Sequence, residues 1–203
     1  MKIKGILLAG GHSRRMGVNK ALLEIGEEPL ISRLLSQLLI VAESVMVSSG
    51  ERDTNEYEFL GVKIIPDQYP GLGPLGGLHA GLSSSDAEWN VVMACDLPFA
   101  HHGLLQALLA IVQGAGTQVQ AVIPVAEGGK VQPLLAFYHR SVLPSLEEVL
   151  KQRRLRVLEW LEGLNVIYVP VEDFPHALFN MNTPEDYRTA VQRVHFAQDE
   201  GSE

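Results

Sequence analysis

The residues best suited to chemistry lie in one loop near the start of the chain, LAGGHSRRMGVNK at residues 8–20. Two adjacent glycines let backbone N–H groups approach phosphate oxygens closely, and Arg14, Arg15 and Lys20 can add charge-assisted bonds to the same oxygens. The loop follows an apolar run at residues 4–9, which indicates a buried strand. This pattern predicts a triphosphate site, with an ordinary glycine turn carrying solvated basic residues as the alternative.

Two common phosphate-binding motifs do not describe this loop. A Walker A loop places its lysine directly after the last glycine, whereas Lys20 lies three residues beyond Gly17. The G-x-G-x-x-G dinucleotide fingerprint does not fit residues 8–20 either. The spacing therefore indicates another class of nucleotide-binding loop.

Two aspartates follow predicted strands at the sheet edge where ligands bind. Asp96 ends the apolar run at residues 89–95, and Asp67 follows the run at residues 62–66. One carboxylate next to a phosphate loop suffices for Mg²⁺, which completes its octahedron with phosphate oxygens and water. The alternatives are that Asp96 caps a helix beginning near His101 and that Asp67 is a turn residue.

The remaining pattern predicts an α/β protein, a three-layer α/β/α sandwich with a mostly parallel, Rossmann-like sheet. Unbroken apolar strands alternate with helices, as a sheet covered on both faces requires. We expect strands at residues 4–9, 44–48, 62–66, 89–95, 120–125, 133–138 and 166–171. We expect helices at residues 29–42, 78–84, 103–112, 145–152 and 157–161, with a glycine-rich loop at residues 71–77.

Composition limits the function classes. The chain has 203 residues, 46% hydrophobic and 20% charged, which favours a single domain over residues 1–197 with a flexible acidic tail at 198–203. The net charge of −8 argues against binding to nucleic acid or anionic membranes. Cys95 is the single cysteine, which excludes an internal disulfide and suits a cytoplasmic location. No apolar stretch approaches the length that spans a bilayer.

Several motifs together resemble one family. The pattern L-A-G-G-x-S-x-R-M-G-x-x-K is similar to the signature of nucleotidyltransferases that activate small metabolites, and its double glycine most resembles the molybdenum cofactor guanylyltransferase (MobA) family. GPLGGL at 73–78, CDLPF at 95–99, QPL at 132–134 and NMNTPED at 180–186 agree with it. The resemblance covers residues 3 to about 190. Ser48 departs from it, because family members can place an asparagine after the second strand.

The resemblance implies guanylyl transfer from GTP to the terminal phosphate of molybdopterin, with molybdoenzyme-maturation proteins as further partners. It implies Mg²⁺ at Asp96 and a catalytic set of Arg15, Lys20 and Asp96. It further implies nucleotide contacts from Leu8, Ala9, Gly10, Gly11, Lys20, Asp67, Gly73, Gly77 and Asp96. Arg156, Asn180 and Asn182 would contact the acceptor, and we expect their effects to be separable from those of the nucleotide residues.

Alternatives remain open at several of these positions. Helix capping explains the TPED part of residues 180–186, and Arg156 could belong to a solvated helix start. The adjacent His101 and His102 point apart and make a poor zinc site, and Cys95 fits a buried hydrophobe better than a nucleophile.

Three other functions compete with the implied one. The nearest is the cytidylyltransferase of the same cofactor, because the choice of guanine over cytosine rests on the resemblance alone. Another is a transferase that activates a sugar phosphate or an isoprenoid precursor. The third, from a different class, is a GTP-binding adaptor without catalysis.

Overall fold

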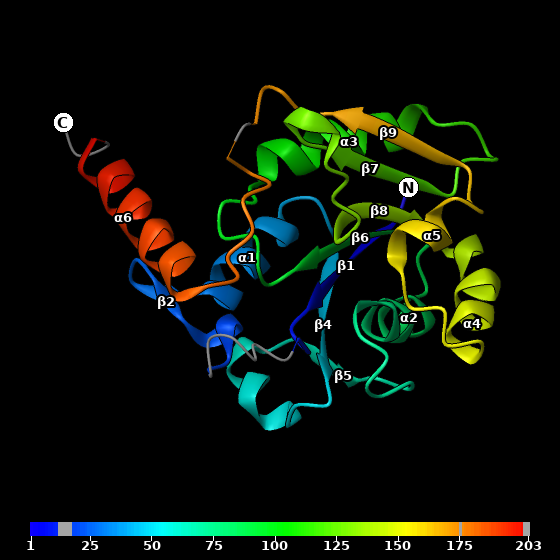
Figure 1. Cartoon of the computed structure of the whole chain (residues 1–203), viewed down its shortest axis with the longest axis horizontal. Coiled ribbons are helices and arrows are strands. Elements are labelled where there is room, and N and C mark those ends of the chain that lie inside the picture. Colours follow the sequence, from blue (N-terminus) through cyan, green and yellow to red (C-terminus); the bar gives the residue numbers. More distant parts are fainter. Residues whose placement is uncertain (12–17, 175, 201–203) are drawn as a thin grey trace.

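The computed structural model describes the backbone of residues 1–11, 18–174 and 176–200, and side chains in those segments as far as residue 194. A seven-stranded sheet with the order β5-β4-β1-β6-β8-β7-β9 forms its centre (Figure 1). Its strands are β1 (Ile3–Leu8), β4 (Ser44–Gly50), β5 (Lys63–Pro66), β6 (Trp89–Ala94), β7 (Ala121–Val125), β8 (Leu135–His139) and β9 (Val166–Pro170).

The expected mostly parallel sheet is confirmed. Strand β1 pairs in parallel with β4 and β6, β4 pairs in parallel with β5, and β7 pairs in parallel with β9. Strand β8 runs antiparallel to both β6 and β7. The carboxyl ends of β1, β4, β5 and β6 therefore lie at one edge of the sheet, where their loops can meet.

Helices cover both faces of this sheet, as the continuous apolar strands predict. They are α1 (Leu30–Leu39), α2 (Pro74–Ser84), α3 (His102–Gly114), α4 (Leu143–Lys151) and α5 (Val157–Leu161), whereas α6 (Pro184–Glu200) lies to one side (Figure 1). One buried cluster joins Leu7 of β1 to Leu34 of α1 and Leu104 of α3. A second joins Ile6 of β1 to helices α2, α4 and α5 (Figure 1). Because alternate residues of β1 enter different cores, the three-layer sandwich follows directly from strand geometry.

The expected boundary of α2 is wrong by one turn. The helix begins at Pro74 rather than at residue 78, so Gly76 and Gly77 are helical. Gly73 caps this start with a φ of 68°, a value that glycine adopts without strain, and Pro74 occupies the first turn. The segment expected as a glycine loop is therefore half loop and half helix.

Several short elements are absent from the expected set. They are the hairpin strands β2 (Glu24–Ile25) and β3 (Glu28–Pro29), and the 3₁₀ helices η1 (Lys20–Leu22), η2 (Thr54–Leu60), η3 (Glu127–Gly129) and η4 (Arg140–Val142). Helix α6 stands out from the body of the molecule (Figure 1). Its backbone continues to Glu200, past the position where we expect the acidic tail to begin.

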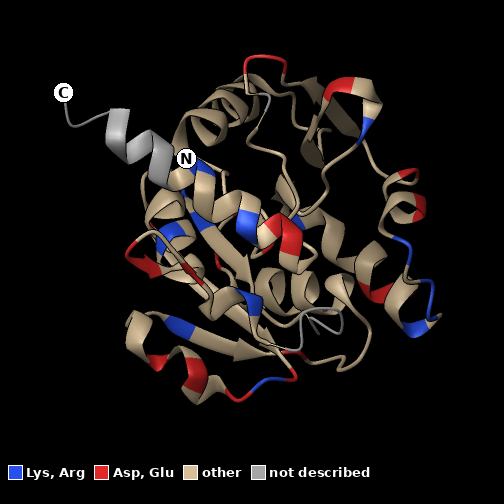
Figure 2. Cartoon of the chain, turned by 60° about the vertical axis from the view of Figure 1, so that its left-hand side comes forward, with Lys and Arg blue, Asp and Glu red and all other residues tan. Residues whose placement is uncertain are grey.

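Charge is distributed over the whole molecule. Figure 2 shows lysine and arginine interleaved with aspartate and glutamate on several elements instead of collecting on one face. Among the described residues, no helix has the length and apolar character needed to cross a membrane.

Candidate active site

A cleft of about 450 Å³ opens at the carboxyl edge of the sheet. The ends of the adjacent strands β1 and β6 line it. After β1 the chain builds one half of the sheet, β4 and β5, and it then returns at β6 to build the other half. Open α/β sheets bind ligands at such a reversal of strand order. Its lining includes Leu8, Ala9, Gly10, Gly11, Lys20, Asp67, Gly73, Gly77, Asp96 and Asn182. Arg15 lies outside the described residues.

Glycine is required where the first loop leaves β1. A Cβ atom on Gly10 would lie 2.5 Å from the Cα and 2.7 Å from the N of Gly50, at the end of β4. Gly50 has a φ of 64°, and a Cβ there would lie 2.6 Å from the Cα of Gly10. The two backbones approach this closely because neither residue has a side chain, and the approach leaves the cleft open above them.

Lys20 spans the cleft to the C-terminal motif. Its Nζ donates to the backbone oxygen of Met181 and to Oδ1 of Asn182, each at 2.9 Å. The Met181 amide donates to the backbone oxygen of Asp96 at 2.7 Å, which ties the same segment to the end of β6. Asn182, which we expect to serve the acceptor, is thus in direct contact with Lys20, which we expect to serve the nucleotide. Whether their effects are separable stays a prediction.

Asp96 is a partly buried carboxylate beside Lys20. Burial raises the pKa of Asp96 above its ordinary value, while the positive charges of Lys20 and Lys130 act in the opposite direction. Asp96 does not cap α3, because His101 occupies the N-cap position and its Nδ1 accepts from the Gly103 amide at 3.2 Å. A desolvated carboxylate facing a cleft gains from a cation, so the structure favours the ligand interpretation over the capping one.

The donor set suits a metal that takes few protein ligands. Among the described residues, no group of three or more histidine, cysteine, aspartate or glutamate side chains could hold a metal ion. A caged zinc or calcium site therefore does not fit them. A single carboxylate beside a phosphate loop does fit Mg²⁺, because phosphate oxygens and water provide the other ligands.

Buried Ser48 and partly buried Asp67 form a pair on a second wall of the cleft. The Ser48 hydroxyl donates to Oδ1 of Asp67 at 2.9 Å. Burial raises the pKa of Asp67, and the hydrogen bond from Ser48 acts to lower it. A Cβ on Gly77 would lie 3.0 Å from the Ser48 Oγ, so glycine lets the first turn of α2 pack on this pair.

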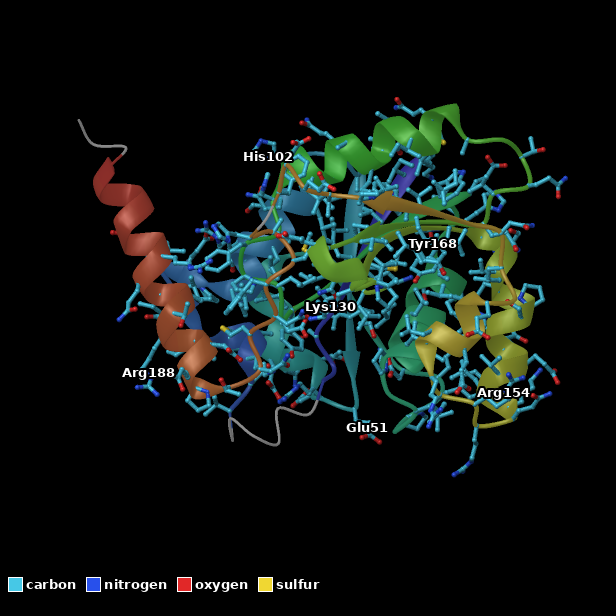
Figure 3. The ribbon with its side chains drawn as sticks, turned by 45° about the horizontal axis from the view of Figure 1, so that its top comes forward. Glu51, His102, Lys130, Arg154, Tyr168 and Arg188 are labelled. Carbon is cyan, nitrogen blue, oxygen red and sulfur yellow. The ribbon has the colours of Figure 1, made fainter. Side chains whose placement is uncertain are left out.

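The other expected acceptor residues do not line the cleft. The Nδ2 atom of Asn180 donates to the backbone oxygen of Leu178 at 3.3 Å. Arg156 precedes α5, its side chain is 84% exposed, and it pairs with Glu159 at 2.8 Å. Figure 3 shows the neighbouring Arg154 across α2 from Glu51, which lines the cleft. The geometry of Arg156 agrees with a solvated helix start.

The C-terminal motif contains the predicted cap. Thr183 Oγ1 accepts from the Asp186 amide at 3.1 Å, and the Asp186 carboxylate accepts from the amides of Asn182 and Thr183 at 2.8 Å each. This reciprocal arrangement is a capping box at the start of α6. The cap fixes the backbone of Asn182 next to Lys20, so the same motif both starts a helix and builds the cleft.

The remaining candidates have structural roles. His102 contacts Gln37, its ring Nδ1 lying 3.0 Å from the amide oxygen, and His101 caps α3. Cys95 is buried, and burial raises the pKa of its thiol well above the ordinary value. A thiol held in its protonated form is a poor nucleophile.

Sequence reasoning gave no role to several residues of the lining, including Asn19, Ser48, Gly50 and Glu51. Ser48 and Gly50 end β4 at the ligand-binding edge of the sheet, and that position was the available signal. Asn19 lies within the first motif, but its environment depends on η2, which is distant in sequence. Its Nδ2 donates to Glu56 and to Tyr57 at 2.7 and 3.0 Å.

The sequence matches the family of MobA-like NTP transferase domains over residues 5–164. This chain belongs to the MobA-like NTP transferase family. It is 35% identical to a "Probable molybdenum cofactor guanylyltransferase" of Pelotomaculum thermopropionicum, over 92% of this chain and 90% of that protein. A relative of the same name from Carboxydothermus hydrogenoformans is 34% identical, over 92% and 93%.

A solved structure agrees with this membership. The molybdopterin-guanine dinucleotide biosynthesis protein A of Archaeoglobus fulgidus superposes with a TM-score of 0.80 and 30% identity. The superposition covers 95% of this chain and 99% of that protein. This MobA-like chain thus shares the fold over nearly its whole length.

Proposed function

We propose that this chain transfers the guanylyl group of GTP to the terminal phosphate of molybdopterin in the molybdenum cofactor, with release of pyrophosphate. One observation carries the proposal: backbone from the glycine loop, the Lys20 ammonium and the Asp96 carboxylate line one cleft at the end of β1 and β6. The curated relatives named above supply the identity of the nucleotide and of the acceptor.

In the proposed reaction an oxygen of the acceptor phosphate attacks the α-phosphorus of GTP, and the bond from that phosphorus to the pyrophosphate oxygen breaks. The attacking phosphate is already ionised, so the cleft needs no general base. The protein acts by orientation and by neutralising charge. We expect the amides of Gly10 and Gly11 and the ammonium of Lys20, which line the cleft, to bind triphosphate oxygens, and Arg15 to join them.

Asp96 is the proposed Mg²⁺ ligand. Mg²⁺ bound there and to the triphosphate oxygens would neutralise charge that develops on the leaving pyrophosphate. Members of nucleotidyltransferase families typically use a divalent metal, and the single carboxylate makes Mg²⁺ the better candidate than a metal that needs several protein ligands. Asp67, Gly73 and Gly77 line the same cleft, and we expect them to contact the nucleoside.

Other parts of the proposal rest on sequence and on the relatives. We assign residues 1–197 to one catalytic domain working in the cytoplasm, with molybdoenzyme-maturation proteins receiving the product. Arg156 and Asn180 remain proposed acceptor contacts. Because neither lines the cleft, they would act on a part of the acceptor that extends beyond it.

The test uses the four nucleoside triphosphates in parallel with Mg²⁺ and molybdenum-loaded molybdopterin. Guanylyl transfer predicts that GTP is consumed, that pyrophosphate is released, and that a guanine dinucleotide appears. A product formed from CTP would replace the guanylyltransferase assignment with a cytidylyltransferase. GTP binding without pyrophosphate release would instead support a non-catalytic adaptor.

A further inference from the structure

The hydroxyl of Tyr57 lies between the two ends of the glycine loop. It donates to the backbone oxygen of Ala9 at 3.2 Å and accepts from Nδ2 of Asn19 at 3.0 Å. Ala9 directly precedes the double glycine and Asn19 directly precedes Lys20, and all of them line the cleft. The Tyr57 hydroxyl therefore links Ala9, where the loop leaves β1, to Asn19, the residue before Lys20.

Asn19 transmits this contact to Lys20. Its Oδ1 accepts from the Ala21 amide at 3.2 Å, which caps η1, the short helix that begins with Lys20. Its Nδ2 is shared between the Tyr57 hydroxyl and Oε2 of Glu56, the latter at 2.7 Å. With both ends of the amide engaged, the orientation of Asn19 is set, and the start of η1 is set with it.

Tyr57 is itself held firmly. It is fully buried in η2, the segment between β4 and β5 drawn in cyan in Figure 1, whose start is capped by Asp53 accepting from the Asn55 amide at 3.0 Å. Burial raises the pKa of Tyr57 to about 12, so the phenol keeps its proton for Ala9 at all physiological pH values. Arg52 adds a bond from Nη2 to the Gly11 oxygen at 3.2 Å. Residues 52–57 thus contact both described ends of the loop.

Core packing alone accounts for the ring of Tyr57 but not for its hydroxyl. A phenylalanine ring would fill the same space, and burying a hydroxyl is unfavourable unless it is hydrogen-bonded. Tyr138 gives the comparison within this chain. It is also fully buried, and its hydroxyl donates to the Pro133 oxygen at 2.8 Å, yet it lies in the second core cluster and contacts neither Ala9 nor Asn19.

We propose that Tyr57 is a positioning residue for the triphosphate. It holds Ala9 and Asn19 at a fixed separation, so that the amides after Ala9 and the ammonium of Lys20 meet the same chain of phosphates. The inference rests on the proposed function, because it takes a nucleoside triphosphate as the ligand. In this proposal η2, which lies outside the recognised motifs, sets the distance between the two ends of the phosphate loop.

The test compares GTP with GMP on the full chain, using Mg²⁺ and titration calorimetry. Tyr57→Phe keeps the ring and removes the hydroxyl. The affinity for GTP should fall about fivefold to tenfold, as expected for the loss of one or two hydrogen bonds that order a binding loop. GMP affinity should change less than about twofold, because GMP lacks the β- and γ-phosphates. Tyr138→Phe is the matched control and should leave GTP affinity unchanged.

A second variant tests the same contact from its other side. Asn19→Ser keeps an oxygen that can cap η1 but removes the amide group that donates to Tyr57. It should also lower the affinity for GTP more than the affinity for GMP. Tyr57→Phe should lower GTP affinity much less in the Asn19→Ser background than in the wild type, because both changes break the same contact. If Tyr57→Phe fails to fold, the GTP-to-GMP comparison on Asn19→Ser alone decides.

Three results would overturn the inference. They are an unchanged GTP affinity in the variants, an equal loss for GTP and GMP, and additive effects in the double variant. A wild-type protein that binds none of the four nucleoside triphosphates would overturn the proposed function and this inference together. Failure of the inference alone is recognised by normal GTP binding in the wild type.

Discussion

The Nζ atom of Lys20 lies 2.9 Å from Oδ1 of Asn182, although the two residues are 162 positions apart in the chain. The contact joins the first glycine loop to the segment that starts α6. It gives Asn182 a structural role that requires no acceptor, because its Oδ1 orients the ammonium of Lys20, the proposed donor to the triphosphate.

The first prediction concerns this pair. Asn182→Ala should weaken GTP binding by about threefold to tenfold, because it removes a hydrogen bond that orients a charged donor. Lys20→Ala should weaken it about tenfold or more, since it removes the charge itself. Calorimetric titration with GTP and Mg²⁺ measures both. Asn180→Ala is the control, because its side chain bonds to Leu178 outside the cleft. Normal GTP affinity with a slower transfer in Asn182→Ala would return Asn182 to the acceptor alone.

The second prediction separates activity from stability at Asp96. Asp96→Asn should abolish turnover with Mg²⁺, because the neutral amide is a weak ligand. Without metal at neutral pH, the variant should melt at the same temperature as the wild type or higher. The sign follows from the raised pKa. Because the pKa of Asp96 is higher in the folded than in the unfolded protein, its contribution to stability is fully present below the unfolded-state pKa. That contribution is lost as the pH rises through the folded-state pKa, and an asparagine does not lose it.

Thermal melts in EDTA from acidic to neutral pH, run in parallel for both proteins, test this. The wild type should lose more stability than Asp96→Asn over the interval between the ordinary carboxyl pKa and the raised one. A variant that retains near-normal activity with Mg²⁺ would remove Asp96 from the metal site. A variant that melts well below the wild type at neutral pH would contradict the assigned cost of burying its charge.

The third prediction uses two adjacent glycines. Gly10→Ala should lower the free energy of unfolding by about 1–3 kcal/mol and impair GTP binding, because its Cβ would meet the backbone of Gly50. At Gly11 an added Cβ meets no described atom within 4 Å. Gly11→Ala should therefore stay within about 0.5 kcal/mol of the wild type. Urea unfolding of the two variants measures the difference, and equal stabilities would contradict the close approach of Gly10 and Gly50.

The fourth prediction concerns Ser48 and Asp67. Ser48→Ala should raise the pKa of Asp67 further, because it removes the hydrogen bond that favours the ionised carboxylate. A carboxyl NMR titration of Asp67 measures the shift. Ser49→Ala is the matched control, since Ser49 is also buried but its hydroxyl bonds to the backbone of Ile65 at 3.4 Å. A pKa that moves equally in both variants would mean that general loosening of β4, and not the lost bond, is responsible.

The sequence by itself determined the layers of the fold and predicted the chemistry of the first loop. Apolar strands such as β6 are buried along their whole length, so they are visible without any knowledge of their neighbours. The glycine pair and Lys20 predict phosphate binding through local backbone freedom and charge, which are also properties of sequence. Asp96 was found because the end of a buried strand is a position of known meaning.

Only the tertiary structure decided which residues share the cleft. Asn180 and Asn182 are two positions apart in one motif, yet only Asn182 lines it, because the capping box of α6 and the bond to Lys20 set their directions. Arg156 has the right charge, but it does not line the cleft, and its exposed side chain pairs with Glu159. Tyr57 carries no signal in the chain, since its role consists entirely of partners that folding brings to it, and the position of Ser48 at the end of β4 does not reveal its bond to Asp67. Contacts between distant segments depend on strand order and on how helices pack, and the local pattern of residues does not contain either.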